Sequence, residues 1–316
     1  MSDVLTITLN PAVDRSTSTE HVVPEEKLRC ETPKTEAGGG GINVARAIGA
    51  MGGVARAFVA ISGFQGQRYL ERLREEPVIP EVFHTHGETR QSFAVIDRTT
   101  GEQYRFVTPG PTWTPQQADE VITAIHRCTP QRGYVVLSGS QPPGVPLDFP
   151  SKVAAKMRDH SANLILDTSG GPLKALLKPG AARPHVLRLD GAESEDLAGR
   201  TFANMHEVAD FAQELIARDV AEVVVLALGA DGSILVENGN RWHSNITQEV
   251  IPVSKVGAGD SFVGVFTWSL SQGAAWEEAL RMGVAAAASA VTTEGTELCR
   301  KDHVEDLARD ALLERI

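Results

Sequence analysis

The chain has 316 residues and a formal net charge of −11 at pH 7. This length allows a sizeable core in one large domain, and the acidic balance argues against a nucleic-acid or anionic membrane surface as the main partner. Three distant cysteines without metal-ligand spacing indicate neither a disulfide framework nor a zinc site. The start of the chain lacks the pattern of a signal peptide, and no stretch is long enough to cross a membrane. We therefore expect a cytoplasmic protein.

The chain opens with a predicted buried strand. Val4 to Leu9 are apolar or β-branched, and Asn10-Pro11 predicts a turn after them. Asp14 follows closely. Residues 15–36 then become polar and β-compatible, with few large apolar groups, which predicts an excursion from the core.

Four glycines, Gly38 to Gly41, precede a predicted helix over residues 42–48. A glycine run can be a flexible linker, but it can also let the backbone approach a bound ligand closely. We favour the ligand-binding loop because an apolar helix follows directly. Asn43 could hydrogen-bond a sugar hydroxyl or simply cap the helix.

A strand (55–62) and a polar helix (67–75) come next, and then two alternating runs, 91–97 and 102–107. Gly101 lies in the turn between these runs, which is typical of a β-hairpin. We expect the hairpin to pair with the earlier excursion. The two segments, about 15–36 and 88–109, would form a small sheet, here called the lid, over the end of the first strand.

The second half alternates between helix and strand. Thr114, Pro115 and Gln117 predict a capped helix to about residue 126. The other predicted elements are strands at 133–138, 163–167, 185–189 and 223–228, a helix at 208–217, a hairpin at 233–243, a helix at 275–293 and a final segment at 304–313. Such alternation predicts one α/β domain over residues 1–316, with a mostly parallel sheet between two layers of helices.

The sequence Val256-Gly-Ala-Gly-Asp-Ser-Phe262 follows an extended run, 248–254, and opens a helix predicted over 261–271. Unpaired N–H groups at a helix start favour an anion, and glycines admit a phosphate close to the backbone. Asp260 could then accept a proton from an attacking hydroxyl during phosphoryl transfer. The simpler alternative is a capped helix with Asp260 as its N-cap.

Two motifs together resemble the signatures of the PfkB, ribokinase-like carbohydrate kinases: Gly-Gly-Gly-Gly-Ile-Asn-Val-Ala-Arg-Ala at 38–47 and the Gly-Ala-Gly-Asp motif at 257–260. Within that family the chain looks most like the 6-phosphofructokinases of ribokinase type. The stretches that carry this likeness are 5–14, 24–30, 101–107, 138–144 and 295–299. The resemblance implies a ribokinase-like three-layer α/β/α core with a β-sheet lid.

The resemblance also implies roles for individual residues. Asp260 matches the catalytic base, and the amides of Gly257, Ala258 and Gly259 match the anion hole. Sugar contacts are implied for Asp14, Gly39, Gly40, Asn43 and Ser138, phosphate contacts for Lys27, Arg90 and Arg105, and ATP contacts for Arg188, Leu228, Gly229, Gly232, Gly257 and Gly259.

The chain departs from the family pattern at its metal motif. The usual Lys-Pro-Asn-x-x-Glu is replaced by Arg188-Leu-Asp-Gly-Ala-Glu193. Glu193 is still expected to organise Mg²⁺ through water, and Asp190 is a possible second contact. Residues 293–297 differ from the close relatives around a monovalent-cation site, so dependence on K⁺ is left open.

The implied reaction transfers the γ-phosphate of MgATP to the C1 hydroxyl of fructose 6-phosphate, and the implied assembly is a homodimer through the lid. Tagatose 6-phosphate or fructose 1-phosphate could replace that substrate. A non-catalytic sugar-phosphate sensor is a further alternative because of the altered metal motif. An NAD-dependent oxidoreductase would share the architecture, but Asn-Pro-Ala-Val-Asp14, not Gly-x-Gly-x-x-Gly, follows the first strand.

Overall fold

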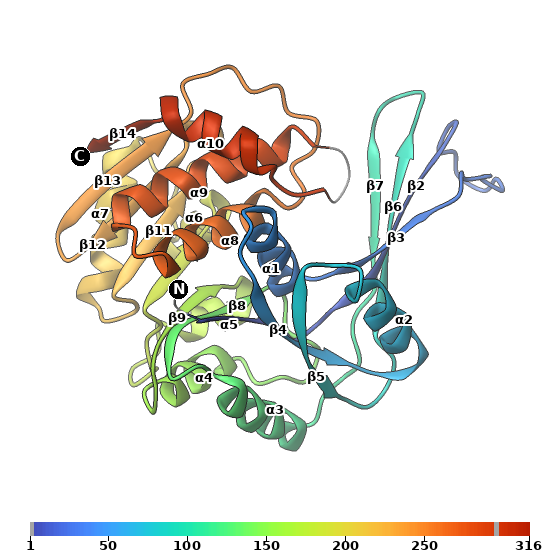
Figure 1. Cartoon of the computed structure of the whole chain (residues 1–316), viewed down its shortest axis with the longest axis horizontal. Helices are drawn as coiled ribbons and strands as arrows, with labels where there is room; N and C mark the ends of the chain where they lie inside the picture. The colour runs from blue at the N-terminus through green and yellow to red at the C-terminus, as the bar shows by residue number, and fades with distance from the viewer. Residues whose placement is uncertain (1–2, 294–296) are drawn as a thin grey trace.

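The structure is a computed structural model that describes residues 3–293 and 297–316. Its larger sheet contains β1 (Asp3–Thr8), β4 (Ala55–Ile61), β5 (Val78–His84), β8 (Arg132–Ser138), β9 (Ser161–Asp167), β10 (Val186–Leu189), β11 (Val223–Ala227), β12 (Ser233–Glu237), β13 (Asn240–Asn245) and β14 (Leu312–Arg315). In the described residues the strand order is β14-β13-β12-β11-β10-β9-β8-β1-β4-β5 (Figure 1). The strands from β11 to β5 in this order are parallel, and β12, β13 and β14 are antiparallel.

Helices cover both faces of this sheet, as the alternating sequence predicted. One face packs against α3 (Pro115–Cys128), α4 (Phe149–Met157), α5 (Gly170–Ala175), α6 (Gly191–Ala198) and α7 (Met205–Ala217). The other packs against α1 (Gly40–Ala50), α2 (Gly63–Leu73), α8 (Ala258–Ser271) and α9 (Trp276–Val291), with α10 (Lys301–Asp310) packed on α9. Successive side chains of β1 point to opposite faces of the sheet: Leu5 and Ile7 pack in the core on one face, and Val4 packs in the core on the other.

Local sequence explains several element boundaries. Thr114 caps α3 through Gln117 in a reciprocal capping box, with proline in the first turn. The predicted hairpin at Asn238-Gly239 is present as β12 and β13. None of the helices in the described part of the chain is both long and apolar enough to span a membrane.

A second, four-stranded sheet projects beside the main body (Figure 1, right). It comprises β2 (Ala12–Thr19), β3 (Lys34–Gly38), β6 (Arg90–Asp97) and β7 (Gln103–Val107), in the order β3-β2-β6-β7. The hairpin β6–β7 joins the earlier excursion because β6 pairs in parallel with β2. This is the pairing that the sequence predicted, and we call the four strands the lid sheet.

The two faces of the lid sheet differ in chemistry. Asp14, Ser92 and Val107 occupy paired positions on one face, where Arg90 and Arg105 also lie by strand alternation. Phe93 pairs with Phe106 on the opposite face, and Val95 pairs there with Tyr104. One face therefore carries most of the charged groups, together with Val107, whereas the other carries the paired aromatic and apolar side chains, with Arg15 opposite Phe93.

The sequence prediction missed both outer strands of the large sheet. Strand β5 contains Pro80 and alternates poorly, which an edge strand tolerates. The predicted terminal segment 304–313 is instead the end of α10 followed by β14. The extended run 248–254 belongs to neither sheet, although the N–H groups of Val253 and Ser254 both donate to the carbonyl of Val291.

Candidate active site

A pocket opens where β8, β9 and β10 end and where α8 begins. Its lining residues are Ser138, Gly139, Ser140, Asp167, Thr168, Ser169, Arg188, Glu193, Gly259 and Asp260. The carboxyl ends of parallel strands are the usual place for ligands in α/β sheets, because loops and helix starts converge there. The predicted base and both ends of the altered metal motif therefore share one pocket.

The start of α8 is suited to an anion. Gly257 is its N-cap in a left-handed conformation (φ +77°), which glycine adopts without strain, and no side chain of the described residues caps the helix there. A Cβ on Gly259 would lie 3.3 Å from Nη1 of Arg188. Gly259 and Arg188 thus line the same pocket, and the combination of a helix start with a guanidinium favours a phosphoryl group.

Asp260 lies in the first turn of this helix and is not its N-cap. The Nδ2 group of Asn43 donates to its Oδ2 at 2.9 Å. Burial and the nearby Asp167 carboxylate raise the pKa of Asp260 to about 6, although Asn43, Arg188 and Arg46 act in the opposite direction. A carboxyl with this pKa is ionised near neutral pH yet basic enough to accept a proton.

Asp167 is a pocket residue that the sequence analysis did not single out. The hydroxyl of Ser138 donates to its Oδ2 at 3.0 Å, and Nη1 of Arg188 donates to its Oδ1 at 3.2 Å. Its position directly after the apolar run of β9 was a usable signal, since that end of a parallel strand points to a ligand site.

The altered metal motif forms the start of α6. The backbone N–H of Glu193 donates to Asp190 Oδ1, and that of Asp190 donates to Glu193 Oε2, both at 2.8 Å. Aspartate therefore keeps the capping role that asparagine could serve there. Burial is the main reason that the pKa of Glu193 rises to about 7; Asp190 and Asp167 add to this rise, which the Asp190 N–H bond and Arg188 oppose.

The donor set suits a magnesium ion held mainly by nucleotide phosphates and water. Asp167 and Glu193 offer carboxylate oxygens at the pocket. However, no group of three or more His, Cys, Asp or Glu in residues 3–293 and 297–316 is placed to hold a metal by itself. Mg²⁺ commonly keeps several waters and binds through few carboxylates. The segment 293–297, where dependence on potassium was left open, includes Glu294, Gly295 and Thr296, which lie outside the described residues.

The glycine run packs against the ends of β1 and β8. A Cβ on Gly40 would lie 2.5 Å from Ser138 Oγ, and one on Gly41 would lie 2.4 Å from the Ile7 carbonyl. Gly39 has φ +130° and would contact Thr8. Close packing within the protein is therefore enough to require these glycines, even without a bound ligand. The same packing brings α1 to the pocket.

Asp14 and two arginines meet on the polar face of the lid sheet. Burial raises the pKa of Asp14 to about 6; Arg90, Arg105 and a hydrogen bond from Ser92 oppose this rise, and Glu36 adds to it. Nε of Arg90 donates to the Asn10 carbonyl at 3.1 Å, and burial lowers the pKa of Arg90. The predicted hydroxyl-binding carboxylate and two of the three predicted phosphate-binding cations therefore lie together.

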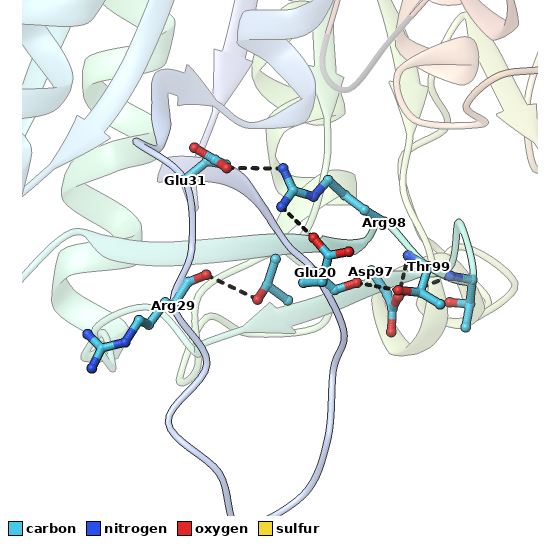
Figure 2. Close-up of polar contacts among 8 residues, drawn as sticks. Glu20, Arg29, Glu31, Asp97, Arg98 and Thr99 are labelled. Atoms are coloured by element: carbon cyan, nitrogen blue, oxygen red, sulfur yellow. Dashed lines mark hydrogen bonds and ion pairs between the residues drawn. The ribbon is translucent and has the colours of Figure 1, made fainter.

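Lys27 is placed differently, on the exposed loop between β2 and β3. Figure 2 shows how the base of this loop is held, because Arg98 pairs with Glu20 at 2.9 Å and Glu31 at 3.0 Å. Next to this ion-pair network, the buried carboxylate of Asp97 accepts hydrogen bonds from the backbone N–H groups of Thr99 and Val22. Lys27 is not among the residues lining the pocket of its own chain.

The predicted nucleotide turn follows β11. Leu228 donates its N–H to the Gly232 carbonyl at 2.8 Å around the short helix Gly229–Asp231. Gly232 has φ +85°, and a Cβ there would lie 2.0 Å from the Ser244 carbonyl. This turn also lies at a carboxyl strand end, but it does not contribute to the lining of the pocket.

These features occur in a chain whose residues 3–303 match the family model described as pfkB family carbohydrate kinase. The chain belongs to this family. It is 38% identical over 302 residues to the ATP-dependent 6-phosphofructokinase isozyme 2 of Mycobacterium tuberculosis, covering 96% of this chain and 88% of that protein. It is 28% identical over 314 residues to the 1-phosphofructokinase of Bacillus subtilis, covering 99% and 100%.

A solved structure agrees with the fold. The phosphofructokinase-2 from Escherichia coli in complex with potassium superposes with a TM-score of 0.91 at 34% identity, covering 98% of this chain and 99% of that one. The chain is thus a kinase of the pfkB family with the ribokinase-like core and separate small sheet that the sequence predicted.

Proposed function

We propose that this carbohydrate kinase transfers the γ-phosphate of MgATP to the C1 hydroxyl of fructose 6-phosphate and forms fructose 1,6-bisphosphate. The observation that carries the proposal is the pairing of Asp260, with its raised pKa of about 6, with the uncapped start of α8 beside Arg188. The likeness to a 6-phosphofructokinase at 38% identity, against 28% for a 1-phosphofructokinase, supports this substrate. We also propose a single domain over residues 1–316, with the lid at about 15–36 and 88–109.

In the proposed reaction Asp260 accepts the proton of the attacking hydroxyl. The amides at Gly257 to Gly259 and the Arg188 guanidinium stabilise the charge on the phosphoryl group. Mg²⁺, when bound with ATP, neutralises phosphate charge, and Glu193 and Asp167 would hold its water shell. The turn Leu228 to Gly232 is proposed to contact the nucleotide. Dependence on potassium stays open.

The lid supplies the sugar-phosphate contacts. Asp14 accepts hydrogen bonds from sugar hydroxyls, as the resemblance also implies for Asn43, Gly39 and Gly40. Arg90 and Arg105 bind the phosphate, for which forked guanidinium groups are well suited. Lys27 remains a predicted phosphate contact. Closure of the lid would exclude water that could otherwise accept the phosphoryl group.

The apolar face of the lid sheet is proposed to pair with the same face of a second chain. Phe106 and Phe93 are 58% and 36% exposed there. Exposed aromatic side chains paired on one sheet face favour association with another surface, although the Arg15 guanidinium lies over the Phe93 ring. The expected assembly is a homodimer.

The decisive experiment measures ADP release from MgATP with fructose 6-phosphate, tagatose 6-phosphate, fructose 1-phosphate, fructose and ribose. We expect turnover to be fastest with fructose 6-phosphate and to be lost in Asp260→Asn while ATP binding is retained. Faster turnover with tagatose 6-phosphate or fructose 1-phosphate would support the kinase activity but change the proposed substrate. ATP binding without turnover on any sugar would favour the sensor.

A further inference from the structure

Two residues from distant parts of the chain meet at the proposed base. Asn43 lies on α1 and Asp260 on α8, 217 positions apart, and their side chains are joined by the 2.9 Å bond from Nδ2 to Oδ2. The resemblance accounts for Asn43 as a sugar contact. It does not account for a direct hydrogen bond from Asn43 to the proposed base, Asp260, when no substrate is bound.

The packing of the two helices holds this bond at a fixed separation. Ala47 follows Asn43 by four residues and Gly264 follows Asp260 by four, so each pair lies on one helix face. A Cβ on Gly264 would lie 2.6 Å from Cβ of Ala47 and 2.8 Å from the Val44 carbonyl. The helix backbones therefore approach as closely as glycine allows, one turn beyond the Asn43–Asp260 bond.

The charged groups around Asp260 act differently from the neutral side-chain amide of Asn43. Burial and Asp167 favour the protonated carboxyl, and Arg188 and Arg46 favour the ionised one. Both arginines have other carboxylate partners. Arg188 pairs with Asp167 at 3.2 Å, and Arg46 pairs with Glu76 at 3.1 Å and Glu36 at 3.5 Å. Asn43 instead donates directly to the carboxylate of Asp260.

We propose that Asn43 is a positioning residue for the base: its amide N–H stabilises the ionised Asp260 carboxylate and holds Oδ2, leaving Oδ1 for the sugar hydroxyl. This inference rests on the proposed function of Asp260. It differs from a sugar-binding role because it concerns the protonation state of the base, which a substrate contact alone would not change.

The test is the pH dependence of kcat at saturating MgATP and sugar phosphate for the wild-type chain and Asn43→Ala. Loss of a hydrogen bond to a charged group is expected to move the acid limb of kcat upward by about one pH unit. For a wild-type limb near pH 6, kcat at pH 6 then falls about fivefold more than kcat at pH 8.5. Asp14 also has a pKa of about 6, but it is present in both proteins, so their difference reports Asn43.

Asn163→Ala is the matched control, because Asn163 is an asparagine on β9 outside the pocket lining. It should leave the limb unchanged. A raised KM for the sugar phosphate with an unshifted limb in Asn43→Ala would overturn the inference and leave a substrate contact.

Gly264→Ala provides an independent variant with Asn43 intact. The added methyl group separates α1 from α8 and should also move the acid limb upward, by less than Asn43→Ala does. An unshifted limb in a folded Gly264→Ala protein would contradict the role of helix packing in holding the bond.

Asp260→Asn separates this inference from the proposed function. If Asp260→Asn keeps substantial turnover, the assignment of the base fails. If Asp260→Asn is inactive and Asn43→Ala shows no shift, only the positioning role fails.

Discussion

Burial and hydrogen bonding shift the pKa values of several carboxyl groups of this chain in opposite directions. The pKa values of Asp14 and Asp260 rise to about 6 and that of Glu193 to about 7, and burial is the first cause in each case. By contrast, hydrogen bonds led by the N–H of Val22 lower the pKa of Asp97 to about 2 at the base of the lid loop. These three raised values belong to carboxyl groups of the proposed chemistry, whereas the lowered value of Asp97 belongs to a structural contact.

The raised pKa of Asp260 predicts a stability cost that Asp260→Asn removes. The native state binds a proton at Asp260 more tightly than the unfolded chain, so stability falls as pH rises from about 3.8 to 6 and stays lower above it. At pH 8 the variant should be more stable by on the order of 3 kcal/mol, and the gain should vanish below about pH 4. Urea unfolding at the two pH values measures this.

Asp97→Asn provides a control of opposite sign. Its lowered pKa means that the carboxylate stabilises the fold above about pH 3.8 and that this stability is lost as pH falls through 2. The variant should therefore be less stable than wild type at pH 8. Equal stability of Asp260→Asn and wild type at both pH values would contradict the cost assigned to the base.

At the scale of elements, glycines determine how closely helices approach the sheet and each other. The glycine run at the start of α1 packs against the ends of β1 and β8. Gly264 allows α8 to contact α1 closely, and Gly283 of α9 packs against Phe262 of α8. The two family motifs therefore have a packing reason besides any ligand contact. They bring two helix starts and their polar residues to the edge of the sheet where the parallel strands end.

Gly41→Ala should destabilise the chain, because the added Cβ would lie 2.4 Å from the Ile7 carbonyl. We expect a loss of about 1–3 kcal/mol, as for overpacking elsewhere. Gly191→Ala is the matched control in the first turn of α6, where the nearest atom would be 3.7 Å away. It should be neutral or slightly stabilising. Thermal unfolding compares them, and equal melting temperatures would argue against the packing role.

At the scale of the whole molecule, the lid sheet stands beside the main body (Figure 1). Its two faces carry different side chains. The polar face gathers Asp14, Arg90 and Arg105, and the apolar face pairs Phe93 with Phe106. Period-two alternation along the same strands places both sets, so substrate contacts and chain association are expected to depend on one element.

Phe106→Asp should convert the proposed homodimer into monomers, because it places a charge within the apolar face. Light scattering at micromolar concentration measures the mass. The control is Phe64→Asp on α2, since Phe64 is similarly exposed, at 64% against 58%, but lies outside the lid sheet. A monomeric wild-type chain, or an unchanged mass for Phe106→Asp, would refute association through this face.

Much of the architecture is determined by local patterns in the sequence. Alternating runs specify most of the strands, Thr114 with Gln117 specifies the start of α3, and Asn238-Gly239 specifies a hairpin. These signals act within a few residues, so they can be identified before the chain is folded. The two glycine motifs likewise predict helix starts suited to ligands.

Other features were decided only by the tertiary structure, because they depend on residues distant in sequence. Strand β14 exists through pairing with β13, and β5 through pairing with β4 at the sheet edge. Asp167 joins the pocket because β9 lies beside β10. The pKa of Asp260 follows from burial and from Asp167, and its bond to Asn43 follows from the contact of α1 with α8. Residue types and local elements can thus be predicted from the sequence, whereas the protonation state and orientation of the proposed base require the assembled core.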